Sequence, residues 1–298
     1  MSVHLSVLTS EVLEGLDLSP SDIVVDATVN GGGHASHIIE KLSDSGVFIG
    51  FDLDQSALDI SNERLKHAKC QVSLVNRSFH EIAEVLNEME LRSIDKILFD
   101  LGWSSNQFEK AERGFSFNED GPLLMTLSDD PSKATFTAYD IVNEWEEEHI
   151  IDILVGYGEE KYARRIAQKI VEAREVEAIV STKQLAHIIS EAVPASYRNG
   201  RIHPATKSFQ ALRITVNNEM EVLKIGLAES FKKLNKGGRM AVISFHSIED
   251  RIVKLYFRDL KNKGEAILVT KKPIIAGQDE LLANRRSRSA KLRIIEKI

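Results

Sequence analysis

The sequence contains very little cysteine, proline and aromatic side chain. Of its 298 residues, one is cysteine (Cys70), six are proline and 6% are aromatic. A single cysteine excludes an intramolecular disulfide and a zinc site built from several cysteines, and it is typical of a protein from a reducing compartment. With six prolines and 17 glycines there is no Pro/Gly-rich linker. If two domains exist, we therefore expect one to be inserted into the other through short connections.

Long apolar runs and an excess of basic charge are also missing. No run approaches the ~20 residues that span a bilayer. The N-terminal stretch carries early acids instead of the basic-then-apolar pattern of an export signal. We therefore expect a cytoplasmic protein without a membrane partner. The 38 basic and 45 acidic residues give a net charge of −7, which excludes a uniformly basic surface but leaves room for a local basic patch.

Strand-like and helix-like segments alternate over the first hundred residues. Short apolar runs predict four strands, at residues 23–28, 47–51, 71–76 and 94–101. Helical periodicity follows each of the first three, and Asp54 is a good N-cap for the second helix. Such alternation is typical of a parallel sheet covered by helices on both faces. The sequence therefore predicts an α/β fold.

The pattern changes to loop and then to helical periodicity between residues 106 and 203, which predicts a helical insertion. It then resumes with a helix at 217–234, which the Asn235–Gly238 turn is expected to cap. A strand, a helix and two further strands complete a predicted sheet of about seven strands. These last elements are expected at residues 239–245, 248–263, 266–270 and 291–296.

Three successive glycines follow the first predicted strand, in Gly31-Gly32-Gly33-His34. Glycines allow a backbone to pass close to a ligand, and the helix that follows presents free N–H donors. A nucleotide-type cofactor or an amino-acid carboxylate fits such a loop. The spacing matches neither G-x-G-x-x-G nor G-x-x-x-x-G-K-[ST], which disfavours NAD and ATP. A tight turn without a ligand is the alternative interpretation.

Acidic residues end three of the predicted strands, as Asp26, Asp52 and Asp100. Ligands of open α/β sheets lie beyond the carboxyl ends of the strands, where Asp52 could accept hydrogen bonds from both ribose hydroxyls. The alternative for Asp52 is N-capping shared with Asp54. Phe79, after the third strand, could stack on an adenine or belong to the core.

Asp100 opens a polar turn that contains Ser104 and faces the expected position of the reacting group. Two later polar clusters include Asn217 and His246. A lone histidine is more often structural than catalytic, and no His-x-x-x-His spacing is present, so we predict no required metal. The tail, residues 271–298, carries eight basic and three acidic residues. It suggests contact with phosphates or, alternatively, a solvated loop.

In the glycine loop, the polar turn after Asp100 and the later polar clusters, the chain resembles the ribosomal small-subunit methyltransferase H family. Members are S-adenosylmethionine-dependent enzymes that methylate N4 of a cytidine in 16S ribosomal RNA. The resemblance covers His4 to Lys297, and it rests on the order and spacing of its motifs together. The motifs are Gly31–His34, Asp100–Gln107, Arg113–Phe117, Asp120–Leu123, Tyr157–Glu160, His203–Thr206, Phe209–Ile214, Ile243–Arg251 and Arg288–Arg293.

The resemblance implies a class I, Rossmann-like S-adenosylmethionine methyltransferase domain formed by residues 1–105 and 207–298. Residues 106–206 are then a mainly helical substrate-recognition insertion. The implied partner is 16S ribosomal RNA in the small ribosomal subunit, and the oligomeric state, monomer or homodimer, stays open. The implied cofactor contacts are Gly32, Gly33, His34, Asp52, Phe79, Asp100 and Gln107.

The chain departs from the family pattern in three places, of which Arg285, in place of a proline, costs little. Asn30 stands where the family usually has glycine, and asparagine tolerates a left-handed backbone better than most residues. Leu124, Thr126 and Ser128 replace an Asp, an Arg and an Asp in a loop that is expected to border the substrate. The alternative function is therefore a protein that binds cofactor and RNA with weak or lost turnover. A small-molecule methyltransferase and an NAD-linked oxidoreductase fit the insertion, the basic tail and the glycine spacing less well.

The implied reaction places specific demands on the site. The exocyclic amine of cytosine is a weak nucleophile because its lone pair is delocalised, so nitrogen, methyl and sulfur must be aligned and the amine hydrogens need acceptors. Asp100 ranks first as this acceptor, and the alternative for Asp100 is positioning of the cofactor alone. Ser104 is expected to hold the edge of the base, and Asn217 or His246 to complete the pocket. The target base must be unpaired or flipped out.

Overall fold

The computed structural model describes residues 6–101, 111–128, 132 and 134–298, which form two compact units. Unit 1 comprises Met1–Ser104 and Met220–Ile298, and unit 2 comprises Ser105–Glu219. The second boundary falls after Glu219, later than the return expected at residue 207. The reason is that helix α11 (Thr206–Val216) packs on helices α6 (Ala138–Glu144) and α7 (Glu147–Gly156) of unit 2.

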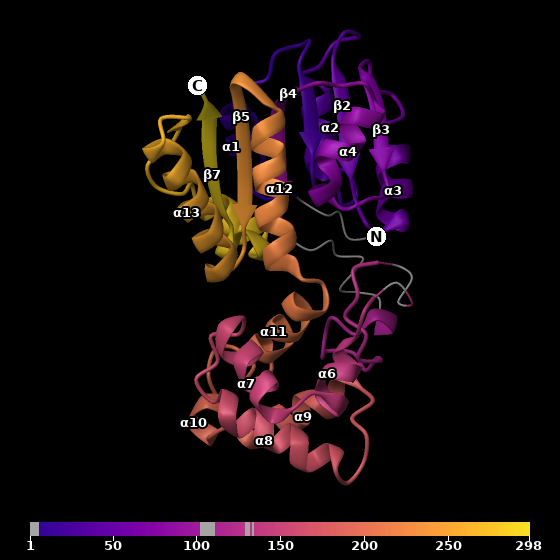
Figure 1. The fold of residues 1–298 in the computed structure, drawn as a ribbon, viewed down its shortest axis with the longest axis vertical. Helices are drawn as coiled ribbons and strands as arrows, with labels where there is room; N and C mark the ends of the chain where they lie inside the picture. Colours follow the sequence, from indigo (N-terminus) through magenta and orange to yellow (C-terminus); the bar gives the residue numbers. More distant parts are fainter. Residues whose placement is uncertain (1–5, 102–110, 129–131, 133) are drawn as a thin grey trace. The chain divides into compact units, whose positions relative to one another are not determined.

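Unit 1 is built on a seven-stranded sheet with the order β3-β2-β1-β4-β5-β7-β6 (Figure 1). The first five strands pair in parallel, and β7 pairs antiparallel with both β5 and β6. The predicted Rossmann-like α/β sheet of seven strands is therefore confirmed. The strands are β1 (Ile23–Asp26), β2 (Val47–Phe51), β3 (Gln71–Val75), β4 (Ile94–Asp100), β5 (Leu234–Ser244), β6 (Ala266–Leu268) and β7 (Lys291–Lys297).

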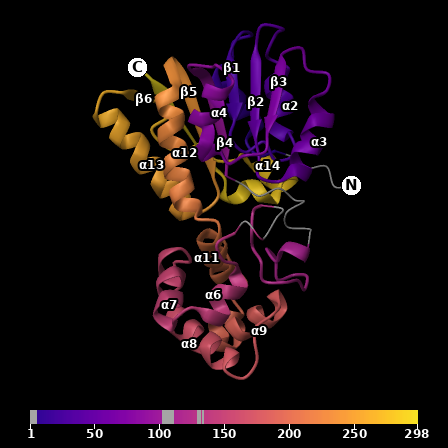
Figure 2. The ribbon, with the colours of Figure 1, turned by 45° about the vertical axis from the view of Figure 1, so that its right-hand side comes forward.

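Helices cover both faces of this sheet and bury two separate apolar cores. On one face α4 (Ile82–Glu88), α12 (Glu219–Lys233) and α13 (Ser247–Asn262) pack around Phe99 (Figure 2). On the other face α1, α2 and α3 pack around Phe48. These three helices are α1 (Thr9–Leu16), α2 (Gly33–Ile39) and α3 (Gln55–Leu65). Burial of these faces is the main favourable term that holds the sheet between the helices.

The parallel register brings the carboxyl ends of three strands together. Asp26 of β1 lies opposite Gly50 of β2 on one side and Leu98 of β4 on the other. Asp52 lies two residues after Gly50, and Asp100 two residues after Leu98. All three acids are therefore at the same edge of the sheet. This is the edge at which open α/β sheets bind ligands.

The structure differs from the expected elements near Gly237. Helix α12 ends at Lys233, and strand β5 begins at once, so residues 235–238 are not a helix cap. They form an irregularity in the pairing of β4 and β5, where Gly237 has a φ of 77°. A left-handed glycine serves both structures, which is why the sequence pattern indicated the wrong one. Helix α1 and, in the tail, α14 (Gln278–Ala283) with the 3-10 turn η4 (Arg285–Ser289) were not expected either.

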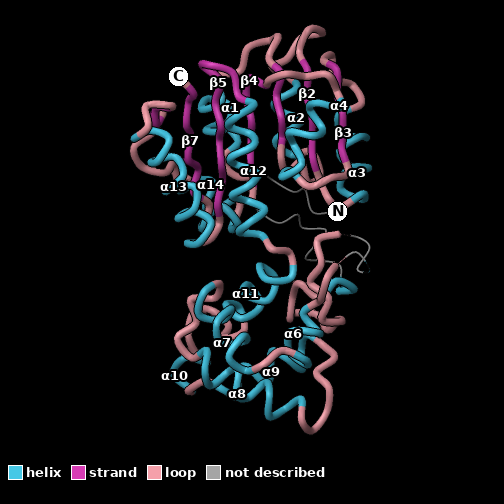
Figure 3. Tube along the Cα trace, in the orientation of Figure 1, coloured by secondary structure: helices cyan, strands magenta, loops and turns pink. Residues whose placement is uncertain are grey.

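Unit 2 consists of helices and loops in the part that is described (Figure 3). Besides α6, α7 and α11 it contains α8 (Ala163–Arg174), α9 (Thr182–Ala192), α10 (Ala195–Arg198) and the 3-10 turn η2 (Ala111–Arg113). The apolar positions that predicted helices are the buried ones, for example Ile150, Ile166 and Ile189. Among the described helices, none has both the length and the apolar character needed to cross a bilayer.

Candidate functional site

The glycine loop folds tightly between β1 and α2. Gly32 donates its N–H to the carbonyl of Val29 at 2.8 Å, with a φ of 75°. A Cβ on Gly32 would lie 3.3 Å from Cα of Ser61, and a Cβ on Gly33 would collide with the hydroxyl of Ser6. Gly32 is thus required by its left-handed φ and its contact with the backbone of Ser61, whether or not a ligand binds, whereas rotation of the Ser6 side chain relieves the contact at Gly33. Asn30 takes a φ of 51°, which confirms that asparagine accommodates the left-handed conformation here.

Asp52 connects this loop to the second strand. Its Oδ2 accepts the N–H of Asn30 and its Oδ1 the N–H of Asp54, each at 2.9 Å. Asp54, not Asp52, caps α3, because its side chain accepts the N–H of Ser56. Each oxygen of Asp52 accepts one backbone N–H and has a second lone pair for a further donor. Burial raises the pKa of Asp52 to about 7.

Asp26, His34 and Asp100 form a charged group beside the loop. Nε2 of His34 lies 3.4 Å from Oδ2 of Asp100, and their side chains are 5% and 13% exposed. Thr28 links the two acidic residues. Its N–H donates to the carboxylate of Asp26 at 3.1 Å, and its hydroxyl accepts the backbone N–H of Asp100 at 2.7 Å. The sequence placed these acids at one edge, and the structure adds His34 between them.

Burial and neighbouring charges move the pKa values of Asp26 and His34 away from their ordinary values. Burial raises the pKa of Asp26 to about 7, although the neighbouring His34 works against this. Burial disfavours a charged His34, but the nearby carboxylates of Asp100 and Asp26 outweigh it and raise the pKa of His34. Within the described part of the chain, Nδ1 of His34 is buried without a hydrogen-bond partner. A buried polar atom of this kind is unusual in a folded protein and suits a ligand that completes its contacts.

Phe79 opens the 3-10 turn η1 (Phe79–Glu81) after β3 and is partly buried. Its ring meets Phe99 edge to face, with centroids 5.4 Å apart, and it fills the space above Gly226 of α12. These contacts support the core interpretation for part of the ring, and stacking on an adenine stays a prediction. Ser104 and Gln107 lie outside the described residues.

His246 caps helix α13. Its Nδ1 accepts the N–H of Glu249 at 3.4 Å, and its Nε2 lies 2.9 Å from Oε1 of the same residue. Glu249 in turn accepts the N–H of His246 at 3.4 Å and that of Phe245 at 2.9 Å. These contacts form a capping box, which gives His246 a structural task. A part in the reaction stays a prediction.

Asn217 lies in unit 2, where its carboxamide holds the loop that departs from the family pattern. Oδ1 accepts the N–H of Leu127, and Nδ2 donates to the carbonyl of Met125, both at 2.8 Å. Nδ2 also donates to the carbonyl of Arg213 at 2.9 Å. This use of the amide makes Asn217 a structural residue of the loop, and its predicted place in the reaction pocket stays untested.

Arg113 holds the same loop from its other side. Its guanidinium, on a residue that is 8% exposed, donates to the carbonyls of Thr126 and Leu127. Sequence reasoning placed Arg113 in a motif without a role for it. Because these bonds and those of Asn217 go to backbone atoms, they do not depend on the side chains at Leu124 and Ser128.

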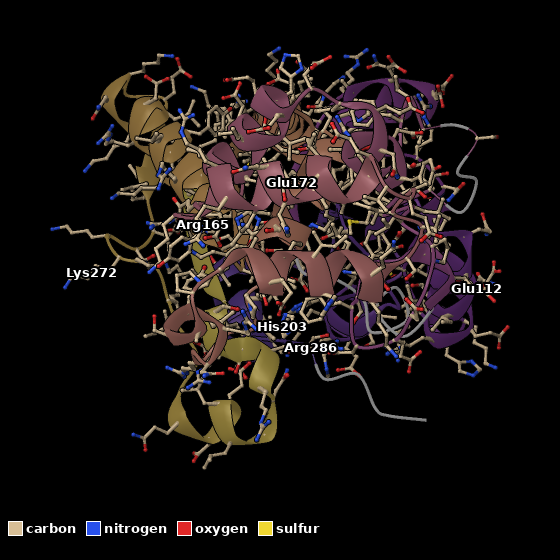
Figure 4. The ribbon with its side chains drawn as sticks, turned by 90° about the horizontal axis from the view of Figure 1, so that it is seen from below. Glu112, Arg165, Glu172, His203, Lys272 and Arg286 are labelled. Carbon is tan, nitrogen blue, oxygen red and sulfur yellow. The ribbon has the colours of Figure 1, made fainter. Side chains whose placement is uncertain are left out.

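The basic tail is only partly available to a ligand. Arg293 and Lys291 pair with Asp250, at 2.7 and 3.4 Å, and they lower the pKa of Asp250 although burial opposes this. Lys297 donates to backbone carbonyls, including that of Leu234 at 2.7 Å. The remaining five basic residues are exposed, and Figure 4 shows Lys272 extending away from the ribbon. They are Lys271, Lys272, Arg285, Arg286 and Arg288.

Comparison with known proteins connects the whole chain to one family. Residues 1–298 match the model of the MraW methylase family. Relatives named "Ribosomal RNA small subunit methyltransferase H" include those of Brevibacillus brevis (42% identical, covering 99% of this chain and 98% of the relative) and Clostridioides difficile (41%, 99% of each). A third, from a Paenibacillus species, is 44% identical over the full length of both chains.

Proposed function

The chain belongs to the MraW methylase family, and from this we propose that it transfers a methyl group from S-adenosylmethionine to N4 of a cytidine in 16S ribosomal RNA. The observation that carries the proposal is the full-length relationship, at 41–44% identity, to proteins named as small-subunit ribosomal RNA methyltransferases. The partner is then the small ribosomal subunit and the location the cytoplasm.

The carboxyl edge of unit 1 suits the cofactor. The second lone pairs of Asp52 match the two hydroxyls of a ribose, and the N-terminus of α2 after Gly32 suits the methionine carboxylate. The unpartnered Nδ1 of His34 offers one further polar contact. Phe79 and Gln107 complete the proposed set. When bound, S-adenosylmethionine supplies a methyl group activated by its sulfonium.

Residues of this chain are proposed to position the cytosine amine and to accept its hydrogen. Asp100 is proposed to accept an amine hydrogen, so that the nitrogen lone pair leaves conjugation with the ring. His34, whose Nε2 lies 3.4 Å from Oδ2 of Asp100, is proposed to orient this carboxylate. Ser104 is proposed to hold the edge of the base, and unit 2 to recognise the RNA.

A binding protein without turnover is the weaker candidate. This candidate rests on the replacement of three charged residues by Leu124, Thr126 and Ser128. Arg113 and Asn217, however, hold the loop through hydrogen bonds to its backbone. The full-length relatives also carry the methyltransferase name. Loss of the three charged side chains therefore does not remove the shape of the loop.

Transfer of labelled methyl from S-adenosylmethionine to undermethylated small subunits tests the proposal. We expect label in 16S ribosomal RNA, a loss of transfer of about 100-fold or more in Asp100→Asn, and little change in Asp59→Asn, an exposed acid on α3. Titration with S-adenosylhomocysteine serves as the control for cofactor binding. Clear cofactor binding without any transfer would favour the binding protein.

A further inference from the structure

Three aromatic rings in unit 2 form a stack that begins in the core and ends at the surface. Phe209 of α11 is 5% exposed, and Phe117 meets it edge to face with centroids 5.0 Å apart. His203 then lies on Phe117, with centroids 4.4 Å apart and planes inclined by 26°. Phe117 is partly buried and His203 is exposed. A buried ring thus supports an exposed one.

The imidazole of His203 is held in one orientation and one tautomer. Its Nδ1 accepts the N–H of Ala205 at 3.2 Å, so the hydrogen of the neutral ring is on Nε2. The chain on its C-terminal side is fixed, because Pro204 and Ala205 are buried. Partial burial against its neighbours lowers the pKa of His203, which favours the uncharged ring. Such a ring offers a flat surface and one donor, not a cation for a phosphate.

The residues beside His203 add charge and further apolar surface. Arg201 and Ile202 precede it directly and are exposed, Ile202 to 60%. Lys207 follows on the first turn of α11 and donates to the carbonyl of Glu159 at 2.8 Å. Exposed aromatic rings beside arginine are the usual surface on which proteins stack unpaired bases.

We propose that the exposed face of His203, supported by Phe117, stacks on an unpaired base of the substrate RNA and that Arg201 contacts an adjoining phosphate. The proposal rests on the RNA substrate proposed above, because a reactive cytidine must lie in an unpaired stretch and its neighbours are then available to stack. The base bound here is recognised by its ring face, so the contact contributes affinity with little sequence preference.

Binding of a fluorescein-labelled single-stranded oligoribonucleotide to the full chain tests this contact. We expect His203→Ala to weaken binding by roughly 5- to 150-fold, the equivalent of the 1–3 kcal/mol lost with one stacked base. His203→Phe keeps a flat ring and should stay within about threefold of the original protein. His187→Ala, at an exposed histidine on α9, is the matched control and should bind normally.

Salt dependence separates stacking from charge. His203→Ala should leave the slope of log affinity against log salt unchanged, whereas Arg201→Gln should lower it by about one phosphate contact. Normal affinity in His203→Ala, or an equal loss in His203→Phe, would overturn the proposal. Binding of S-adenosylhomocysteine and the thermal midpoint should stay unchanged in all variants. If the original protein binds RNA through His203 but methylates none, the proposed reaction fails and this contact stands.

Discussion

Asn217 and Leu127 are 90 residues apart in the sequence, yet Oδ1 of Asn217 accepts the N–H of Leu127 at 2.8 Å. The carbonyl of Met125 receives a second bond from the same carboxamide. The loop that lacks three charged residues of the family pattern is therefore positioned through its backbone. Its shape depends on Asn217 and Arg113 more than on the side chains that differ.

Replacement of Asn217 by alanine should loosen this loop. The substitution leaves polar backbone groups of Met125 and Leu127 without partners, which costs about 1–3 kcal/mol in the free energy of unfolding. We expect this loss in urea unfolding, together with lower methyl transfer and unchanged binding of S-adenosylhomocysteine. Asn199→Ala, at an exposed asparagine, is the control. Full transfer by Asn217→Ala would show that the position of the loop does not matter for the reaction.

Replacing Thr126 by the arginine of the family pattern should destabilise the protein. Thr126 is 2% exposed, and its hydroxyl donates to the carbonyl of Ser128 at 3.3 Å. A guanidinium placed there alone must be buried without a carboxylate, so we expect Thr126→Arg to lower the free energy of unfolding by about 2–4 kcal/mol. Leu124→Asp and Ser128→Asp lie at partly exposed positions and should be tolerated. Urea unfolding of the three single variants and the triple variant measures this, and a stable, more active Thr126→Arg would contradict it.

Cofactor affinity should rise with pH through neutrality. The pKa of Asp52 is raised to about 7 by burial, and the ionised carboxylate is the form that accepts from ribose hydroxyls. Affinity for S-adenosylhomocysteine should therefore fall by up to about tenfold for each pH unit below 7. Calorimetry in buffers of different ionisation enthalpy should detect a proton released on binding at pH 7. Asp52→Asn should remove the pH dependence, and Asp59→Asn should retain it; a flat profile for the original protein would exclude the role of Asp52.

The buried Asp26 should lower the free energy of unfolding at high pH. Its pKa is about 7 in the folded protein, above the ordinary 3.8, so the folded state binds a proton more tightly than the unfolded state. The free energy of unfolding therefore falls as pH rises from about 4 to 7 and stays low above that. We expect Asp26→Asn to be the more stable protein at pH 8, by at most about 4 kcal/mol, with a smaller difference at pH 5 that closes towards pH 4. Urea unfolding at both pH values decides this, and lower stability of the variant at pH 8 would contradict it.

The sequence predicted the sheet edge better than the contacts around it. Apolar runs that end in acids sufficed for Asp26, Asp52 and Asp100, because the carboxyl ends of parallel strands meet at one edge. The tasks of Asn217 and His246 were not predicted, since a hydrogen bond to a distant backbone or a helix cap leaves no separate trace in the residue type. Unit 2 extends to Glu219, beyond residue 206, because packing, not periodicity, assigns α11 to unit 2.

The identity of the methylated nucleoside tests the proposed reaction most directly. Small subunits treated with the protein and S-adenosylmethionine are digested to nucleosides and separated by chromatography with mass detection. We expect N4-methylcytidine, with the added mass on the base fragment, and none after treatment with Asp100→Asn. Methyl on C5 of cytosine, on the ribose or on another base would contradict cytosine N4 methylation by this site.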